Sequence, residues 1–201
     1  MLRLLRSSVV LAMLCVLPCA VHAADAGKAL VVVFGHEGGL QCDPSDPGNW
    51  TGGKVGYGKQ GCTKFGIATN TYPKEDIRNL TLARAAVLYK RDFWKPLRLD
   101  ELESQALATE IFDTSVNCGV GTGANILIQL VNIFGPASYK LTGKVNAEQI
   151  EWINKYTRKK TNRTTFYKAL NVLQGERYLM IIQRNPKMMK YSNSWFSRVG
   201  Q

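Results

Sequence analysis

Histidine is almost absent from this sequence of 201 residues, which contains only His22 and His36. His22 lies near the N-terminus, in a segment that we expect to be removed as a secretory signal. Without it, a metal centre built on two or three histidines is excluded, because one imidazole cannot supply the ligands. The chain also lacks the G-x-S-x-G motif of serine hydrolases and the P-loop of nucleotide-binding proteins. A zinc site that combines His36 with cysteines, and a nucleophilic pair of His36 with Cys118, stay open as alternatives. No C-x-x-C pair supports such a zinc site, so we expect neither a metal nor an organic cofactor.

A hydrophobic run long enough to cross a membrane is also missing. Residues 9–17 are apolar, but this run is too short for a comfortable span of a bilayer. Arg3 and Arg6 precede the run and small residues up to Ala23 follow it, which is the pattern of a removable secretory signal. We expect residues 1–23 to be removed, leaving 178 residues that act in the periplasm or outside the cell.

Acidic residues are scarce compared with basic ones, at 15 against 26. The net charge of +11 falls to +9 when Arg3 and Arg6 leave with the signal. A basic surface suits a polyanionic partner such as nucleic acid, anionic lipid or a bacterial wall polymer, although it also serves solubility alone. Export argues against nucleic acid. We therefore expect an anionic cell-wall polymer as the partner, no stable membrane span, and a monomer.

Three cysteines follow the expected cleavage site: Cys42, Cys62 and Cys118. An odd number in an exported protein indicates one disulfide and a free thiol, or an intermolecular bond. Cys42 and Cys62 flank a glycine-rich loop, so a bond between them would clamp the loop and stabilise the fold by about 3 kcal/mol in the chain-entropy model. The pairings of Cys118 with either of the other two stay open.

Apolar residues at helical spacing predict a mainly helical chain that one segment interrupts. The expected helices cover 25–35, 81–94, 101–116, 124–134 and 163–183, and a further helix begins at Asn146. From 38 to 66, glycine, proline, aspartate and asparagine dominate, and residues 50–58 predict a short β-hairpin. The pattern indicates an α+β fold, mainly α, with a first region at 24–122. A helical C-terminal region at 123–201 packs on the same body, and we expect its apolar tail at 195–199 to dock there.

Glu37 follows the apolar segment 29–34 and precedes Gly38 and Gly39. Desolvation at the end of a hydrophobic helix raises the pKa of a carboxyl group and keeps it protonated near neutral pH. Because the glycines lack side chains, a bulky polymer could approach this group closely. A protonated carboxyl group beside a polar loop is typical of enzymes that hydrolyse glycosidic bonds, which makes Glu37 the candidate acid.

Asp46 and Thr51 lie in the loop that follows Glu37. As a base, Asp46 would activate a water molecule on the opposite face of the sugar, while the hydroxyl group of Thr51 would hold that water. Aspartate beside prolines and glycines also caps turns, so both roles stay open for Asp46.

The residues that carry a family signature are Glu37-Gly38-Gly39, Asp43-Pro44-Ser45-Asp46-Pro47-Gly48 with Thr51, and Gly66-Ile67. They resemble glycoside hydrolase family 108, which comprises lysozyme-like N-acetylmuramidases of bacteria and phages. A weaker similarity continues into the helical C-terminal part, often called a peptidoglycan-binding domain. The chain departs from the family pattern at Leu40, Asn49 and Ala68, where the family has tyrosine, glycine and threonine.

The resemblance implies a lysozyme-like fold, with Glu37 as the catalytic acid and a water molecule directed by Asp46 together with Thr51 or Thr63. The residues expected to contact the sugars, each of which could equally serve packing, are Trp50, Tyr57, Tyr72 and Asn117. The expected reaction is hydrolysis of the β-1,4 bond between N-acetylmuramic acid and N-acetylglucosamine in the glycan strands of peptidoglycan.

Two other interpretations use the same residues. The first is a non-catalytic peptidoglycan-binding or secretion-accessory protein that retains the fold. The second is a phage endolysin, which differs in biology rather than in chemistry.

Overall fold

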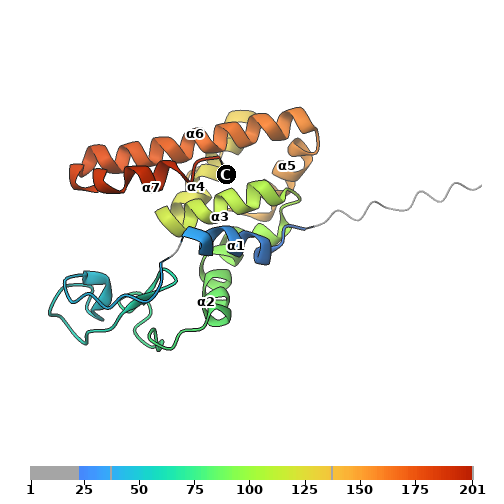
Figure 1. Cartoon of the computed structure of the whole chain (residues 1–201). Coiled ribbons are helices and arrows are strands. Elements are labelled where there is room, and N and C mark those ends of the chain that lie inside the picture. The colour runs from blue at the N-terminus through green and yellow to red at the C-terminus, as the bar shows by residue number, and fades with distance from the viewer. Residues whose placement is uncertain (1–22, 37, 137, 201) are drawn as a thin grey trace, which may run out of the picture.

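The computed structural model describes residues 23–36, 38–136 and 138–200, and it consists of helices with one short hairpin (Figure 1). The α-helices are α1 (Ala26–His36), α2 (Leu82–Tyr89), α3 (Gln105–Cys118), α4 (Val120–Phe134), α5 (Ala147–Thr157), α6 (Lys160–Arg184) and α7 (Ser192–Phe196). The strands β1 (Thr63–Lys64) and β2 (Ile67–Ala68) form an antiparallel pair. Shorter helical turns cover Pro47–Asn49, Lys90–Trp94, Lys95–Leu97, Leu99–Glu101 and Pro186–Tyr191. The predicted α+β, mainly α, fold is confirmed.

The predicted signal at 1–23 lies outside the described residues, apart from Ala23. Across the ranges that the structure describes, no helix combines the length and the apolar character needed to cross a membrane.

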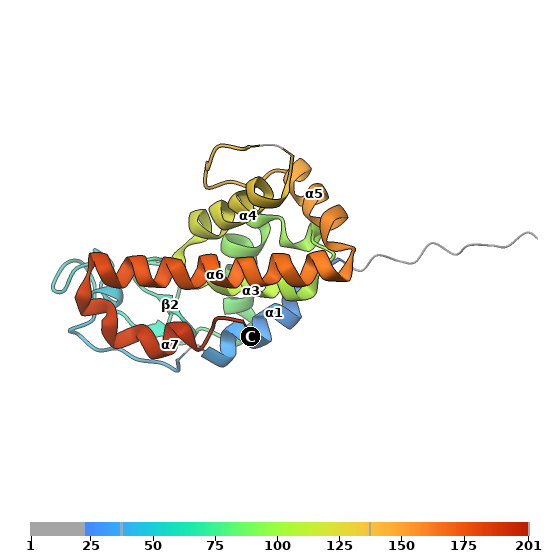
Figure 2. The same cartoon turned by 90° about the horizontal axis from the view of Figure 1, so that it is seen from above.

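The helices form a body in which α3 lies between α1 and α4 (Figure 1). α6 packs against both α4 and α5, and α7 returns alongside the second half of α6 (Figure 2). The segment that we call the glycine-rich lobe, residues 38–79, projects from this body between α1 and α2 (Figure 1). The two regions therefore meet where α1 ends.

Aromatic rings that are buried or partly buried connect α1, α2 and α3. The ring centroid of Tyr89 lies 5.5 Å from that of Phe34 and 6.3 Å from that of Phe112. The Trp94 ring, which follows α2, lies 5.3 Å from Phe112, and both side chains are buried. Edge-to-face pairs of this kind add about 0.5–1.5 kcal/mol each beyond the burial of apolar surface. This cluster anchors the C-terminal half of α1, the helix that immediately precedes Glu37 in the chain.

A second aromatic cluster joins α4, α5 and α6. Trp152 stacks on Tyr156 with 4.9 Å between ring centroids, and Phe134 lies 5.6 Å from Tyr156 and 5.8 Å from Phe166. Since the three helices bury these rings against one another, the C-terminal helices form part of the same body as α3 and α4.

Polar side chains cap the helices where the sequence predicts. The Asp25 carboxylate accepts a hydrogen bond from the first turn of α1 at 2.6 Å, and Thr81 accepts one from the first turn of α2 at 3.2 Å. At α5, Asn146 and Gln149 exchange hydrogen bonds between side chain and backbone, both at 2.9 Å, which is a capping box. Three of the expected helix starts are thereby confirmed.

The bounds of α3 and α4 differ from the prediction. α3 begins at Gln105 instead of Glu101, because Glu101 belongs to a separate turn and Ser104 caps the helix. The gap between the expected helices at 101–116 and 124–134 shrinks to Gly119, whose φ of 91° lets the chain leave α3 and enter α4 at once. α4 therefore begins four residues earlier than the apolar pattern suggests.

The predicted hairpin at 50–58 is wrong in position. This stretch is a loop of consecutive turns, in which Gly53, Gly56 and Gly58 have φ values between 67° and 79°. It is closed by a backbone hydrogen bond of 3.0 Å from Thr51 to Lys59. Glycine at this density favours turns over a strand ladder, so the paired strands lie further along the chain, at 63–68.

The C-terminal tail docks on the body as predicted. Arg198 is buried, and its Nη1 donates a hydrogen bond to Asp113 Oδ1 on α3 at 2.9 Å. The Trp195 ring stacks on Tyr178 of α6 with 5.5 Å between centroids.

Candidate active site

The candidate site begins where α1 ends. Glu37, the predicted acid, lies outside the described residues. The chain that follows it runs beside β1: the Gly38 carbonyl accepts a hydrogen bond from Phe65 N at 3.1 Å, and Gln41 exchanges two backbone hydrogen bonds with Thr63 at 2.9 and 2.8 Å. The segment after Glu37 is thus joined to the edge of the hairpin by an isolated antiparallel bridge between Gln41 and Thr63.

The turn between β1 and β2 holds the hairpin against the helical body. Phe65 and Gly66 have φ values of 50° and 71°, as a two-residue turn of the primed type requires. Positive φ is unfavourable for phenylalanine, and the contacts of Phe65 offset that cost. Its ring centroid lies 6.3 Å from Phe34 of α1, and its carbonyl accepts a hydrogen bond of 3.0 Å from the Tyr89 hydroxyl. The hairpin is therefore fixed to the end of α1.

A network of side-chain hydrogen bonds connects Thr63 with Asp46. The Thr63 hydroxyl donates to Asn49 Oδ1 at 2.9 Å, and Asn49 Nδ2 donates to Gln41 Oε1 at 2.8 Å. Gln41 Nε2 in turn donates to Asp46 Oδ2 at 2.7 Å. We call these four residues the lobe network. Because Asn49 at its centre is fully buried, its bonds are shielded from water and orient both ends of the network.

Asp46 caps the turn Pro47–Asn49. Its Oδ1 accepts a hydrogen bond from Gly48 N at 2.8 Å, while its Oδ2 receives the Gln41 bond. Of the two roles that the sequence leaves open, turn capping is the one that the structure shows. Each carboxylate oxygen can accept a further hydrogen bond, so capping does not prevent contact with water.

The two candidate threonines have different surroundings. Thr63 belongs to the lobe network. The hydroxyl oxygen of Thr51 instead accepts a hydrogen bond from Lys59 N at 2.9 Å, and Thr51 lines a separate cavity of about 230 Å³ together with Glu75 and Asp76. Among the described residues, side-chain hydrogen bonds thus join Thr63, and not Thr51, to Asp46.

The aromatic candidates Trp50 and Tyr57 both lie in the lobe. Trp50 is half-buried, and its indole N–H donates to the Pro44 carbonyl at 2.8 Å. Tyr57 is exposed in the loop of turns, where the Lys54 ammonium group lies 4.6 Å from its ring centroid. Tyr57 therefore presents an open ring face, whereas Trp50 also braces the turn that contains Asp46.

Tyr72 and Asn117 make structural contacts elsewhere. The Tyr72 hydroxyl donates to Asp92 Oδ2 at 2.9 Å, and burial together with this carboxylate raises the pKa of Tyr72. Asn117 Nδ2 donates to the Tyr178 hydroxyl at 3.0 Å and thereby joins α3 to α6. These contacts do not connect either side chain to the lobe network.

The structure contains the disulfide between Cys42 and Cys62, which closes the loop that carries Asp46. This bond removes both thiols from the zinc site that the sequence left open. Cys118 is a free, half-buried thiol, and burial raises its pKa to about 11. A thiol of this kind stays protonated at neutral pH, which argues against its use as a nucleophile.

Two residues of the lobe network, Gln41 and Asn49, are functional candidates that the sequence did not single out. Asn49 stands where the family pattern has glycine, and this departure was the only signal available for it. The buried amide links three segments of the lobe, including the Asp43 carbonyl, to which Asn49 Nδ2 donates at 3.0 Å. The substitution therefore has a structural reason.

Comparison with known proteins supports the signature residues. Residues 30–119 match the family model described as Glycosyl hydrolase 108. No curated protein matches the chain. Among solved structures, one described as "Structure of Brucella abortus SagA" is similar with a TM-score of 0.62 and 20% identity, over 87% of this chain and 88% of that chain, which shows a shared fold. The family match runs from within α1 through the glycine-rich lobe and α2 to the end of α3, and over these residues the chain matches glycoside hydrolase family 108.

Proposed function

We propose that this chain is an exported peptidoglycan hydrolase that cleaves the β-1,4 bond between N-acetylmuramic acid and N-acetylglucosamine. The observation that carries the proposal is the family match over 30–119, which contains Glu37 and the whole lobe network. The basic charge of the chain suits the anionic polymer of the wall.

Glu37 is the proposed general acid. It is the next residue after α1, whose C-terminal end carries a partial negative charge that disfavours an ionised carboxylate nearby. A carboxyl group that keeps its proton near neutral pH can deliver it to the glycosidic oxygen as the bond breaks.

Asp46 and Thr63 are the proposed water-directing pair. The lobe network fixes their mutual orientation, which supports Thr63 over Thr51 for this role. With a carboxylate as acceptor for its proton, a water molecule held between them would attack the anomeric carbon. We place this chemistry in the region 24–122 and propose that 123–201 supports it and contributes to wall binding.

The experiment is digestion of purified peptidoglycan by the chain without residues 1–23. We expect turbidity to fall and new reducing ends to form without new free amines, because a glycosidase leaves the peptides intact. Glu37→Gln, which keeps the size of the side chain, should not clear the suspension. Equal clearing by both proteins would overturn the assignment of Glu37, and new free amines would indicate a peptidase or an amidase.

A non-catalytic wall-binding protein is the second candidate. The observation in its favour is that both carboxylate oxygens of Asp46 already accept hydrogen bonds within the lobe. Sedimentation with insoluble peptidoglycan without release of soluble fragments would support this candidate over the enzyme.

A further inference from the structure

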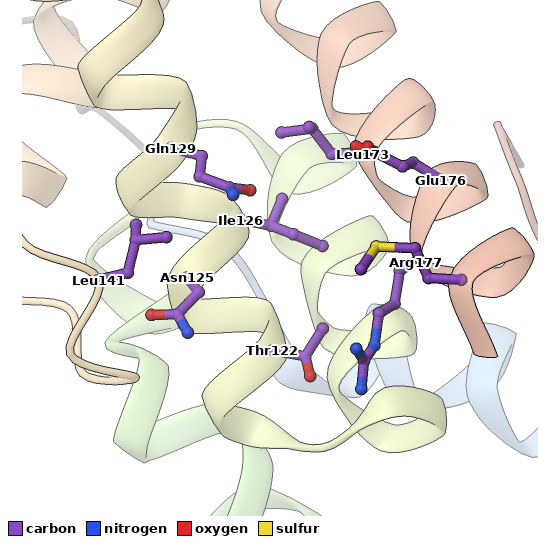
Figure 3. A pocket seen from close by; sticks show the side chains of 9 residues that line it. Thr122, Asn125, Ile126, Gln129, Leu141, Leu173, Glu176 and Arg177 are labelled. Atoms are coloured by element: carbon purple, nitrogen blue, oxygen red, sulfur yellow. The ribbon is translucent and has the colours of Figure 1, made fainter. Parts of the chain in front are cut away.

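A cavity of about 360 Å³ lies between α4, α6 and the loop that carries Leu141 (Figure 3). Its polar lining comes from Thr122, Asn125 and Gln129 of α4 and from Glu176 and Arg177 of α6. The volume falls within the range of about 300–1,000 Å³ that is typical of small-molecule sites. None of these five residues belongs to the lobe network, so the cavity is a separate feature of the molecule.

Arg177 supplies the positive charge of this lining. Five of the nine described arginines (Arg84, Arg91, Arg98, Arg158 and Arg198) pair with a carboxylate, and Arg177 is one of the four that do not. No carboxylate among the described residues lies within 4.0 Å of the Arg177 guanidinium, whose described neighbour is the Cys118 thiol, and the Arg177 Nε is buried without a hydrogen-bond partner. A buried donor on a permanently charged group is costly to leave unsatisfied. The cavity therefore holds a cation that no carboxylate of the described residues neutralises by a direct ion pair.

Two amide side chains extend the recognition surface. Asn125 Oδ1 accepts a hydrogen bond of 2.7 Å from Gly143 N, which fixes the side chain and directs its Nδ2 donor elsewhere. In Figure 3, the Gln129 amide extends from α4 toward α6, and the Arg177 side chain extends toward the beginning of α4, where Thr122 lies. Side-chain amides both donate and accept, which matches the alternating N–H and C=O groups of a peptide backbone.

A ligand for this cavity must offer a carboxylate to Arg177 and amide groups to Asn125 and Gln129. The Glu176 carboxylate, at the same rim, suits an amino group. Leucine, isoleucine and methionine side chains supply the remaining walls and suit short aliphatic groups. A bare peptidoglycan glycan offers acetamido groups and the lactyl carboxylate of muramic acid but no amino group, whereas a short peptide with free carboxylates and a free amino group matches the whole lining.

We propose that this cavity binds the acidic stem peptide attached to the muramic acid of peptidoglycan. The inference rests on the proposed function, because the peptide is taken to be the one attached to the proposed substrate. It adds a peptide-binding site to an enzyme that acts on the glycan. The chain would then distinguish wall strands that carry peptides from strands that have lost them.

The test compares two soluble probes by calorimetric titration of the chain without residues 1–23. One is the disaccharide N-acetylglucosaminyl-N-acetylmuramic acid carrying the tripeptide L-Ala-γ-D-Glu-diaminopimelate, and the other is the same disaccharide without peptide. The bare disaccharide keeps the lactyl carboxylate of muramic acid, but the peptide adds further carboxylates for Arg177 and an amino group for Glu176. These charge-assisted contacts predict that the peptide probe binds about tenfold or more tightly than the bare disaccharide. With Arg177→Gln, the ratio of the affinities for the two probes should fall to about one.

A second variant covers the case in which Arg177→Gln fails to fold. Gln129→Glu keeps the side-chain size and places a carboxylate in the cavity, where it would pair with Arg177 and repel the peptide. It should abolish the ratio as well. Lys168→Gln is the matched control, because Lys168 is exposed and lies nine residues before Arg177, on the opposite face of α6.

Equal affinity of the native chain for both probes would overturn the inference, as would a ratio that persists in both cavity variants. Hydrolysis of peptide-free glycan strands is measured in parallel. If the strands are cleaved but the ratio is absent, the peptide site fails and the proposed function stands. If the ratio is present but neither peptide-free nor peptide-bearing strands are cleaved, the proposed function fails and the site remains as a wall-binding site.

Discussion

The glycine-rich lobe and the helical body are stabilised in different ways. Among the described residues, the lobe contributes only Cys62, Ile67 and Ile77 to the buried apolar side chains, and the body contributes the others. The lobe is instead held by backbone hydrogen bonds between turns, by capping side chains and by the disulfide. Apolar burial is non-directional, whereas hydrogen bonds fix orientation.

This difference assigns separate tasks to the two regions. The body provides stability and a fixed platform at the end of α1, through the ring cluster of Phe34, Tyr89 and Phe112. The lobe provides oriented polar groups, but with little apolar burial behind them. Changes in the body should therefore lower global stability, whereas changes in the lobe should disturb the site while leaving the body folded.

The largest expected loss of stability comes from a substitution in the core of the helical body. Phe112→Ala removes a fully buried ring from the centre of the aromatic cluster. It should lower the free energy of unfolding by about 3–5 kcal/mol, because the transfer of the ring and the remaining cavity both cost stability. Chemical denaturation followed by circular dichroism measures this loss. The control is Val172→Ala on the exposed face of α6, which should change stability by less than about 0.5 kcal/mol.

Breaking the lobe should have the next largest effect. Replacing Cys42 and Cys62 together by alanine opens a loop with a sequence separation of 20 and should destabilise the lobe by about 3 kcal/mol in the chain-entropy model. Hydrolysis of peptidoglycan should fall, while hydrogen exchange of α3 and α4 should stay slow. Cys118→Ala serves as the control. Loss of protection in both regions at once would contradict the separation of lobe and body.

The body should also show a pH dependence that the lobe does not share. Burial raises the pKa of Glu110 on α3 from its ordinary value of 4.5 to about 7. The folded state therefore binds a proton more tightly than the unfolded state does. The resulting stability is fully present below pH 4.5 and is lost as the pH rises through 7, by an amount on the order of 3 kcal/mol.

Glu110→Gln should remove this dependence, since the amide does not titrate. Thermal melting of both proteins between pH 4 and pH 8 measures it. If the melting temperatures of the native chain and the variant fell in parallel over that range, the role of Glu110 would be contradicted.

The substitution with the smallest expected loss of stability should nevertheless have a large effect on the site. Asn49→Ala interrupts the lobe network between Gln41 and Thr63 and should cost about 1 kcal/mol of stability. Because the body is untouched, the turnover rate should fall more than the affinity for peptidoglycan. Thr71→Val removes an exposed hydrogen bond of the same lobe and should leave the rate unchanged. If Asn49→Ala turned over peptidoglycan at the same rate as the native chain, the lobe network would not contribute to catalysis.

The features that the sequence predicted well are local. Asp25, Thr81 and Asn146 cap their helices because a capping side chain bonds to the backbone within a few residues. The disulfide was one of three possible pairings, and the glycine-rich loop between its cysteines favoured the observed one.

The features that it missed depend on distant contacts. The hairpin lies at 63–68 because the segment after Glu37 pairs with β1 and because Phe65 packs on Phe34, and neither contact is visible in a local pattern. In the sequence, Asn49 has the character of a turn residue. Its role becomes visible only in the fold, where it forms hydrogen bonds with Gln41 and Thr63. Candidate residues could thus be named from the sequence, whereas their connection to one another could not.

The central claim is that the carboxyl group at the junction of the two regions protonates the glycosidic bond. Its most direct test is the initial rate at which new reducing ends form from purified peptidoglycan, measured for the native chain and for Glu37→Gln at equal amounts of bound protein. We expect the Glu37→Gln rate to be lower by about 10²–10⁴-fold, which is the usual contribution of a positioned general acid. Equal rates for the two proteins would contradict it.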